Sequence, residues 1–341
     1  MLGMQRAALM QPSHLLVCIL LAFPSLAQVP STLPTFDAAS VRQNNRPDAR
    51  QHANVPLDNG NVYSTVSADD SRTAAGGLFI ATRQPLWRYI SFAYHLSGTQ
   101  ELALRFNMFS GVPKSGAPTW VTGTFTSPAD YFDIEARAAP GTTLDQMRLM
   151  MQALLAERFH LVVHHATAEA PVFALVLTRP GVTGPKLQPH PASDSCTPPA
   201  PGEPSTSSPH PATIASAIGD LPPVCGVIAH VPSAEPGQHY GGRAISISLL
   251  ATSMPTLTGL AAMPRPVIDQ TGLTGLYDFT LHWIHDPNAG ATPADTDESI
   301  VSGNIASFHR ALRDQLGLEL KPTRAPIDVL ILDHIEHPTE N

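Results

Sequence analysis

Charged residues are scarce in this chain of 341 residues, since Asp, Glu, Lys and Arg make up 14% of it, against about 25% in an average soluble domain. Basic residues are the scarcer of the two signs, with 20 Lys and Arg against 28 Asp and Glu and a formal net charge of -8. Lysine occurs only at Lys114, Lys186 and Lys321. Because phosphate groups are bound by clustered basic side chains, this composition argues against nucleic acid as a partner.

Long hydrophobic runs are also missing. The apolar run at residues 15–23 is too short for a bilayer span, which takes about 20 residues, and nothing later in the chain could span a membrane. This run follows Arg6 and precedes Ser25-Leu26-Ala27, a pattern typical of a secretory signal peptide. We expect residues 1–27 to be removed, which predicts a secreted or periplasmic protein without a transmembrane segment. An uncleaved anchor is the alternative.

Cysteine is rare, with three residues in all, and Cys18 would leave with the signal peptide. The remaining pair, Cys196 and Cys225, predicts a disulfide, because an even pair in an exported chain is most simply oxidised. The enclosed segment holds eight of the 34 prolines. A disulfide closing such a loop stabilises a fold by about 3–4 kcal/mol in the loop-entropy model. Two reactive thiols are the alternative, although their spacing matches no redox motif.

The first half of the mature chain alternates helical and extended patterns. Residues 85–94 carry apolar side chains at helical spacing, and residues 132–137 alternate with period two, as a strand does. Thr143 and Gln146 have capping-box spacing at the start of a second apolar helical stripe. Residues 160–165 and 171–177 then read as two strands of a hairpin.

The second half repeats this order. Residues 277–283 alternate as a strand, and a helical stripe from Ile305 to Leu316 precedes Gly317, a suitable C-cap. A second hairpin is expected after it. Two alignments of the halves support the repeat. The first matches Phe159, Leu161 and Val163 with Leu316, Leu318 and Leu320, and the second matches Ala170-Pro171-Val172 with Ala325-Pro326-Ile327.

These patterns predict an α+β fold of two similar ββα-type repeats, each a helix packed on a small, mainly antiparallel sheet. We expect a first lobe at residues 28–190 and a second lobe at residues 225–341. A Pro/Ser-rich, disulfide-closed linker at residues 191–224 would join them. Two unrelated lobes that share generic patterns are the alternative.

Three stretches of the sequence resemble one family. They read FDAASVR from Phe36, ALLAERFHLVVH from Ala153 and RPVIDQTGLTGLYDF from Arg265. The chain resembles the large paralogous family of secreted proteins of unknown function that is abundant in soil acidobacteria. This resemblance implies no established activity. Some relatives are described as fused to membrane sensor segments of the beta-lactam-regulator type, and the repeated unit also resembles the short N-terminal domains of secretins and TonB-dependent receptors, which implies protein contact.

Histidine is the one residue type that invites a metal hypothesis, with 15 in the chain. The best cluster is His282, His285 and Asp286. In a strand, however, His282 and His285 point to opposite faces, so solvated surface histidines are the favoured interpretation and no metal site is assigned. His160, His164 and His165 are likewise interpreted as surface residues.

The sequence lacks the common catalytic and phosphate-binding motifs: it has no G-x-S-x-G nucleophile elbow, no H-E-x-x-H metal-binding motif and no phosphate-binding loop. Asp133 and Asp278 occupy matching places in the two halves, which we interpret as residues that fix the repeated unit. The tryptophans Trp87, Trp120 and Trp283 are assigned to core packing rather than to a ligand groove.

The sequence therefore predicts no catalytic residue and no cofactor. The favoured function is a non-catalytic binding or interaction module at the cell envelope, with an envelope protein or peptide as its partner. An envelope hydrolase, metal-dependent through His282, His285 and Asp286, is one alternative. A sensory domain detached from a membrane regulator is the other.

Overall fold

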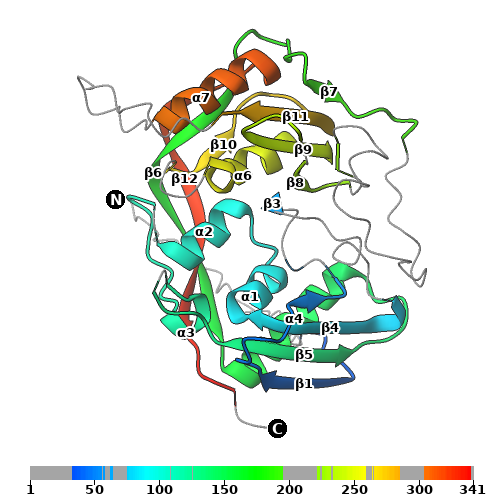
Figure 1. The fold of residues 1–341 in the computed structure, drawn as a ribbon. Helices are drawn as coiled ribbons and strands as arrows, with labels where there is room; N and C mark the ends of the chain where they lie inside the picture. The colour runs from blue at the N-terminus through cyan, green and yellow to red at the C-terminus, as the bar shows by residue number, and fades with distance from the viewer. Residues whose placement is uncertain are drawn as a thin grey trace, which may run out of the picture. The chain divides into compact units, whose positions relative to one another are not determined.

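Figure 1 shows the computed structural model of the protein. It describes residues 33–55, 57, 62–63, 75–107, 109–124, 126–194, 221–222, 225–231, 233–258, 263, 265–284 and 303–338. The expected signal peptide at residues 1–27 lies outside the described residues, as do Cys196, His285 and Asp286. Among the described residues, no helix is long and apolar enough to cross a membrane.

The first sheet is antiparallel and has the strand order β1-β5-β4-β2. Its strands are β1 (Ala38–Gln43), β2 (His52–Ala53), β4 (Leu78–Pro85) and β5 (Tyr131–Arg137). A short 3-10 turn, Ala75–Gly77, leads into β4. The helices in this part of the chain are α1 (Leu86–Ala93), α2 (Gly98–Phe106), α3 (Thr119–Thr122) and α4 (Leu144–Phe159). The apolar faces of α1 and α4 pack with the sheet into a first core that includes Phe79, Tyr89, Phe132 and Phe159.

The second sheet has the order β3-β8-β9-β11-β7. Its strands are β3 (Val62–Tyr63), β7 (Leu187–Pro189), β8 (Ile228–His230), β9 (Gln238–Ile245) and β11 (Tyr277–Trp283). Helix α6 (Ile247–Thr258), helix α7 (Gly303–Ala311) and the π-helical turn Leu312–Leu316 accompany it. Side chains of β11 alternate between buried and half-buried, so that Phe279, Leu281 and Trp283 enter a second core while Thr280 and His282 lie on the outer face.

Two long strands join the halves. β6 (Val162–Leu177) and β12 (Leu318–His334) pair antiparallel over nearly their whole length, and β10 (Val267–Asp269) adds to β6 in parallel (Figure 1). The ladder contributes to all the cores: Leu330 and Leu332 reach the first, Leu175 and Leu318 the second, and Val172 and Ile327 a third cluster with α2.

The expected hairpins at residues 160–177 and after Gly317 are wrong, because each is a single continuous strand. In the ladder, Thr178 donates its backbone N–H to Gly317 across the strands. Since the N–H groups of alternate residues face the partner strand, Pro171 and Pro326 fall on the set that faces away from it. Both prolines therefore fit inside a strand without a lost ladder hydrogen bond.

The α+β class is confirmed by this mixture of helices and mainly antiparallel sheets. The expected strand at residues 277–283 is β11, and the strand at 132–137 is β5. The capping box of Thr143 and Gln146 is present at the start of α4. The helix before β12 ends at Gly317 in the left-handed conformation, as predicted, and α4 ends at His160 in the same conformation.

Asp133 and Asp278 have the same structural role. In each half the first strand of an antiparallel pair has a bulge whose residue has a positive φ, 49° at Arg83 and 50° at Ala244. Asp133 Oδ1 accepts the Arg83 N–H at 2.7 Å, and Asp278 Oδ1 accepts the Ala244 N–H at 2.8 Å. These carboxylates therefore hold strained backbone in place, as expected of residues that fix the unit.

Candidate functional site

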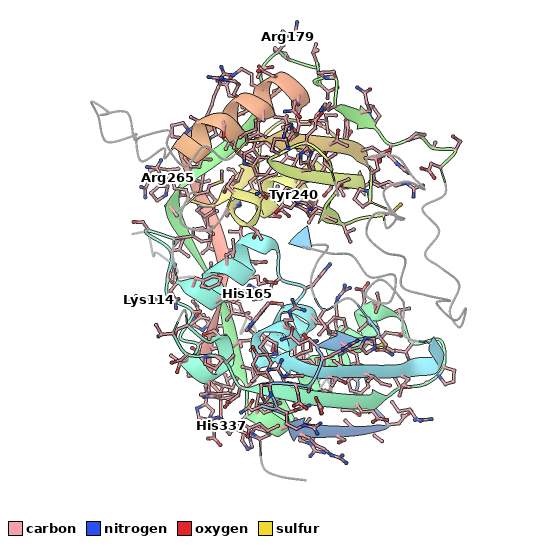
Figure 2. The ribbon with its side chains drawn as sticks, viewed as in Figure 1. Lys114, His165, Arg179, Tyr240, Arg265 and His337 are labelled. Atoms are coloured by element: carbon pink, nitrogen blue, oxygen red, sulfur yellow. The ribbon has the colours of Figure 1, made fainter. Side chains whose placement is uncertain are left out.

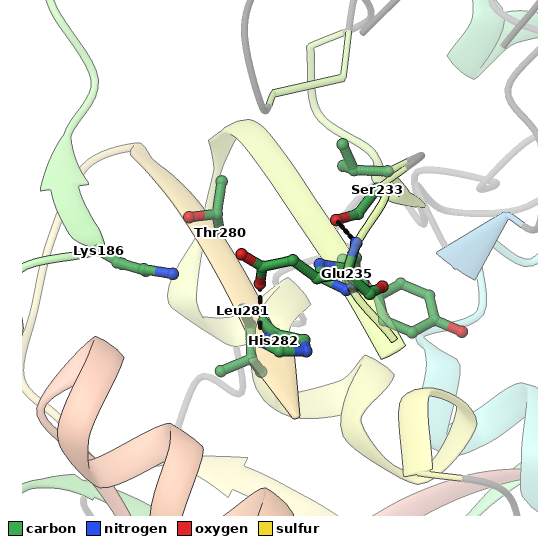
Figure 3. Close-up of a pocket in the computed structure, with 9 residues that line it drawn as sticks. Lys186, Ser233, Glu235, Thr280, Leu281 and His282 are labelled. Atoms are coloured by element: carbon green, nitrogen blue, oxygen red, sulfur yellow. Dashed lines mark hydrogen bonds and ion pairs between the residues drawn. The ribbon is translucent and has the colours of Figure 1, made fainter. Parts of the chain in front are cut away.

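A polar pocket of about 240 Å³ lies over the outer face of β9 and β11 (Figure 3). We call it the histidine pocket. Its lining residues are Lys186, Val231, Ser233, Glu235, His239, Tyr240, Thr280, Leu281 and His282. Strand alternation explains its polarity: His282 and Thr280 belong to the half-buried set of β11, while their neighbours on the strand fill the second core.

His239 and His282 are cross-strand partners in the ladder of β9 with β11. Their side chains therefore project from the same face of the sheet, and their rings stack with centroids 4.0 Å apart and planes at 13°. Gln315 fixes the backbone of His282 from the other side. Its Oε1 accepts the His282 N–H at 3.0 Å, and its Nε2 donates to the His282 carbonyl at 2.6 Å.

The turn before β9 closes over the two rings. Gly237 has φ 123°, and a Cβ at this position would lie 2.7 Å from Nε2 of His282 and 2.6 Å from the Trp283 carbonyl oxygen. Only glycine therefore permits both this backbone conformation and this approach. The turn places the carbonyl groups of Glu235 and Pro236 against the histidine rings.

Those carbonyl groups fix which ring nitrogen of each histidine carries the proton. Nε2 of His239 lies 3.0 Å from the Glu235 carbonyl oxygen, and Nε2 of His282 lies 2.9 Å from that of Pro236. A carbonyl oxygen can only accept, so each Nε2 is the donor. In the neutral imidazoles, each Nδ1 then carries a lone pair. The carboxylate of Glu235 lies near the Nδ1 atom of His282, at a distance of 3.8 Å from Oε2.

The electrostatics favour a neutral His239. Burial lowers the pKa of His239, and the nearby His282 lowers it further, while the hydrogen bond to the Glu235 carbonyl opposes this shift. A lowered pKa keeps the imidazole uncharged and its lone pair available near neutral pH. The ligand atoms of Glu235, His239 and His282 all lie within 4.8 Å of one another. The pocket therefore gathers three electron-pair donors that can bind a cation or a hydrogen-bond donor.

The sequence located one of these three residues. His282 is in the pocket, whereas its expected companions His285 and Asp286 lie outside the described residues. His239 and Glu235 were missed, because only the register of β9 against β11 brings them to His282. The periodicity of residues 277–283 already indicated that His282 was on the polar face, but it gave no partner.

Histidines of the β6–β12 ladder are on the surface, as interpreted from the sequence. His164 contacts Asp333 at 2.8 Å, and His165, labelled in Figure 2, contacts Asp328 at 3.1 Å. Their side chains are each 54% exposed. His160 is the C-cap of α4 rather than a strand residue. His164 and His165 thus form exposed surface pairs with Asp333 and Asp328.

The tryptophans confirm the expectation of core packing in two cases and refine it in the third. Trp87 and Trp283 are buried in the first and second cores. Trp120 is partly buried against the first core and stacks on His337, labelled in Figure 2, with centroids 4.0 Å apart.

A second polar cluster lies on the same sheet near the bulge of β9. Asp278 accepts from the largely buried His190 at 2.8 Å, and His190 in turn contacts the Asp194 carbonyl at 3.2 Å. Arg243 forms an ion pair with Asp194, and its hydrogen bond lowers the pKa of that carboxyl group. Arg243 also accepts the Gly226 N–H at its carbonyl. This cluster fastens two distant segments to β9.

Comparison with known proteins finds one family. Residues 88–335 match a family model described as "Protein of unknown function (DUF3738)", which covers more than half of the chain. No curated protein and no solved structure matches the chain. The match agrees with the expectation of a family without an established activity.

Proposed function

We propose that this chain, which belongs to the DUF3738 family of proteins of unknown function, is an exported, non-catalytic binding module of the cell envelope. Its binding site is the histidine pocket. The observation that carries this proposal is the arrangement of Glu235, His239 and His282, whose ligand atoms lie within 4.8 Å of one another in the lining of the pocket. A set of donors that the fold has already gathered suits binding, because only a small adjustment of the site has to accompany it.

The carboxylates favour binding over catalysis. Asp133 and Asp278, the carboxylates that occupy matching places in the two halves, both accept hydrogen bonds from the bulge residues of their sheets. Each is thus occupied within the protein, since Asp278 also contacts His190 and Asp133 also accepts from Asn44. A general acid or base needs a carboxyl group that reaches the substrate instead.

The proposal includes a duplicated unit. Both halves contain an antiparallel strand pair with an aspartate-capped bulge, then a helix that ends in a left-handed residue, then a long strand. The left-handed residues, His160 and Gly317, occupy the positions that the alignment of Phe159 with Leu316 predicts. Two unrelated lobes would have no reason to share the bulge, its cap and this helix end.

Export is supported by the sequence of residues 1–27 and by the surroundings of the two cysteines. Asp194, two residues before Cys196, is ion-paired to Arg243, and Gly226, one residue after Cys225, donates to the Arg243 carbonyl. The chain on both sides of the expected disulfide is therefore fixed to one residue of β9. This arrangement favours the Cys196–Cys225 pair over two separate reactive thiols. The resemblance to secreted acidobacterial proteins agrees with export.

One observation favours metal-dependent hydrolysis as a second candidate function. Two imidazoles and one carboxylate are the protein ligands of some catalytic zinc sites. The expected His285 and Asp286 are not needed for this set. Hydrolysis would further require a base that activates the metal-bound water, and among the described lining residues the titratable side chains outside the ligand set are Lys186 and Tyr240.

Capture of ligands from envelope extract tests the binding proposal. The mature protein, without an affinity tag that contains histidine, is immobilised beside its His239→Ala and His282→Ala variants and a His164→Ala control. We expect the wild type and the control to retain the same partner and the two pocket variants to lose it. Equal capture by all four proteins would contradict the assignment of the pocket. Turnover of envelope peptides or esters that is abolished by the pocket variants would favour the hydrolase.

A further inference from the structure

We propose that the histidine pocket binds one Zn²⁺ ion through Nδ1 of His239, Nδ1 of His282 and the carboxylate of Glu235. This inference rests on the proposed function, because it takes the pocket to be the binding site and names its ligand. The three residues belong to β9, to β11 and to the turn that precedes β9. They converge from different parts of the sheet rather than from one charged loop.

The donor set selects the metal. Imidazole nitrogen suits zinc and the other late first-row ions, whereas Ca²⁺ and Mg²⁺ prefer oxygen ligands alone. Two neutral nitrogens and one carboxylate oxygen therefore favour Zn²⁺ over the alkaline-earth ions.

The outer contacts of the two rings are those of metal-binding histidines. Such a histidine usually donates its second ring N–H to a carbonyl or carboxylate, which fixes the tautomer and the ring orientation. Both rings do this here, at 3.0 Å to the Glu235 carbonyl and 2.9 Å to the Pro236 carbonyl. For histidines that were merely solvated, adjacent carbonyls of one turn would have no reason to fix both Nε2 atoms.

The distances require a small local adjustment. Zinc bonds are about 2.0–2.2 Å long, so ligand atoms around one ion lie closer together than the 4.8 Å limit of this cluster. The stacked rings also direct their lone pairs nearly parallel, since the planes differ by only 13°. Rotation of one ring about its Cβ–Cγ bond would bring both lone pairs onto one ion. Glu235, with a side chain 73% exposed, is free to follow.

A fourth coordination position would open into the pocket. Lys186 and Thr280 line that side, and the Lys186 side chain extends toward Glu235 and Thr280 in Figure 3. A zinc ion with one carboxylate ligand keeps a single net positive charge, to which the Lys186 ammonium adds another. The fourth ligand is therefore water or an anionic group, such as the carboxylate of a partner peptide.

Zinc titration of the tag-free mature protein tests this inference. The protein is freed of metal with a chelator, titrated with Zn²⁺ by calorimetry, and then analysed for bound metal after gel filtration. We expect one equivalent of zinc, with affinity lowered at least tenfold in His239→Ala and in His282→Ala. The surface variants His164→Ala and His165→Ala should bind as the wild type does. No stoichiometric zinc, or an equal loss in the surface variants, would overturn the site.

A second measurement on the wild type guards against variants that do not fold. Nitrogen-15 shifts of the histidine rings report which ring nitrogen bears the metal. We expect zinc to move the Nδ1 resonances of two histidines and to leave their Nε2 atoms protonated, whereas coordination through Nε2 or by a single histidine would contradict the assignment. Partner capture with chelator present separates the two proposals: capture that still needs His239 but not zinc would overturn only the metal.

Discussion

Ala170 of β6 and Ala325 of β12 face each other directly in the long antiparallel ladder. They are also the residues that the sequence alignment of the two halves makes equivalent. In an antiparallel pair, equivalent residues can oppose each other only where a local twofold axis crosses the ladder. The proposed duplication thus has its symmetry axis at this pair, where both side chains are buried.

The aspartate-capped bulges predict equal effects of mutation in the two halves. Asp133→Ala and Asp278→Ala should each lower the free energy of unfolding by about 1–3 kcal/mol, because the N–H of a bulge residue loses its acceptor. Urea denaturation monitored by circular dichroism measures this. Glu135→Ala is the matched control, since Glu135 is on the same strand as Asp133 and is exposed. A cost at Glu135 as large as that at Asp133 would refute the capping role.

Gly237 predicts a defect in the pocket. Gly237→Ala should lower zinc affinity at least tenfold, because the new Cβ would collide with the His282 ring and the Trp283 carbonyl. Gly272→Ala separates this collision from backbone strain: Gly272 has φ 71° but no atom within 4 Å of its Cβ position. That control should cost about 1 kcal/mol of stability and leave zinc affinity unchanged. If both variants bind zinc as the wild type does, the turn does not position the ligands.

His309 of α7 predicts a loss of stability in mild acid. Burial lowers its pKa, with a smaller contribution from Arg313, and its Nε2 is buried without a hydrogen-bond partner among the described residues. The unfolded chain, with a histidine pKa near its ordinary value of about 6.5, binds this proton more readily than the folded chain. The contribution of neutral His309 to the free energy of unfolding is therefore complete above about pH 6.5. It decreases as the pH falls through that value toward the lower pKa of the folded state.

Thermal unfolding at a series of pH values measures this effect. We expect the Tm of the wild type to fall between about pH 7.5 and pH 5 and that of His309→Gln to fall less. The exposed His164→Gln should follow the wild type. Burial also lowers the pKa of His95, so part of the slope should persist in His309→Gln. An unchanged slope in that variant would rule out His309 as its source.

The expected Cys196–Cys225 disulfide predicts a cross-linked peptide in exported protein. Digestion without reduction by a protease that cleaves before Asp220, which lies between the two cysteines, followed by mass spectrometry, should show the two cysteine peptides joined, and reduction should separate them. Reduction should also lower stability by about 3 kcal/mol in the loop-entropy model. Detection of two alkylated thiols in unreduced protein from the periplasm would exclude the pair.

Local signals in the sequence predicted local structure well. The capping box of Thr143 and Gln146, the alternation of residues 277–283 and the helix end at Gly317 all depend on neighbours within a few positions, and all three are present. The prediction of two hairpins was wrong because Pro171 and Pro326 are ordinary turn residues by local criteria. A strand accepts a proline where the backbone nitrogen of that position faces away from the partner strand, and here the partner strand comes from the other half of the chain.

The candidate site shows the same limit. His282 was identifiable as a polar-face residue from the period of its own strand. His239 and Glu235 became its neighbours only through the register between β9 and β11 and through the turn at Gly237. Register is a relation between distant segments, and a shift by one residue would move His239 to the opposite face of the sheet. The local sequence therefore provided one donor of three.

Because β6 and β12 come from different halves of the chain and pair along nearly their whole length, the two halves are not expected to fold separately. Leu330 and Leu332 of the second half pack in the first core, and Leu175 of the first half packs in the second core. Each half therefore contributes buried side chains to the core of the other. After reduction of the expected Cys196–Cys225 disulfide, a backbone cut between residues 196 and 220 should then leave two pieces that stay bound as a non-covalent heterodimer. Expressed apart, neither piece should reach its native fold until the other is added, as in fragment complementation.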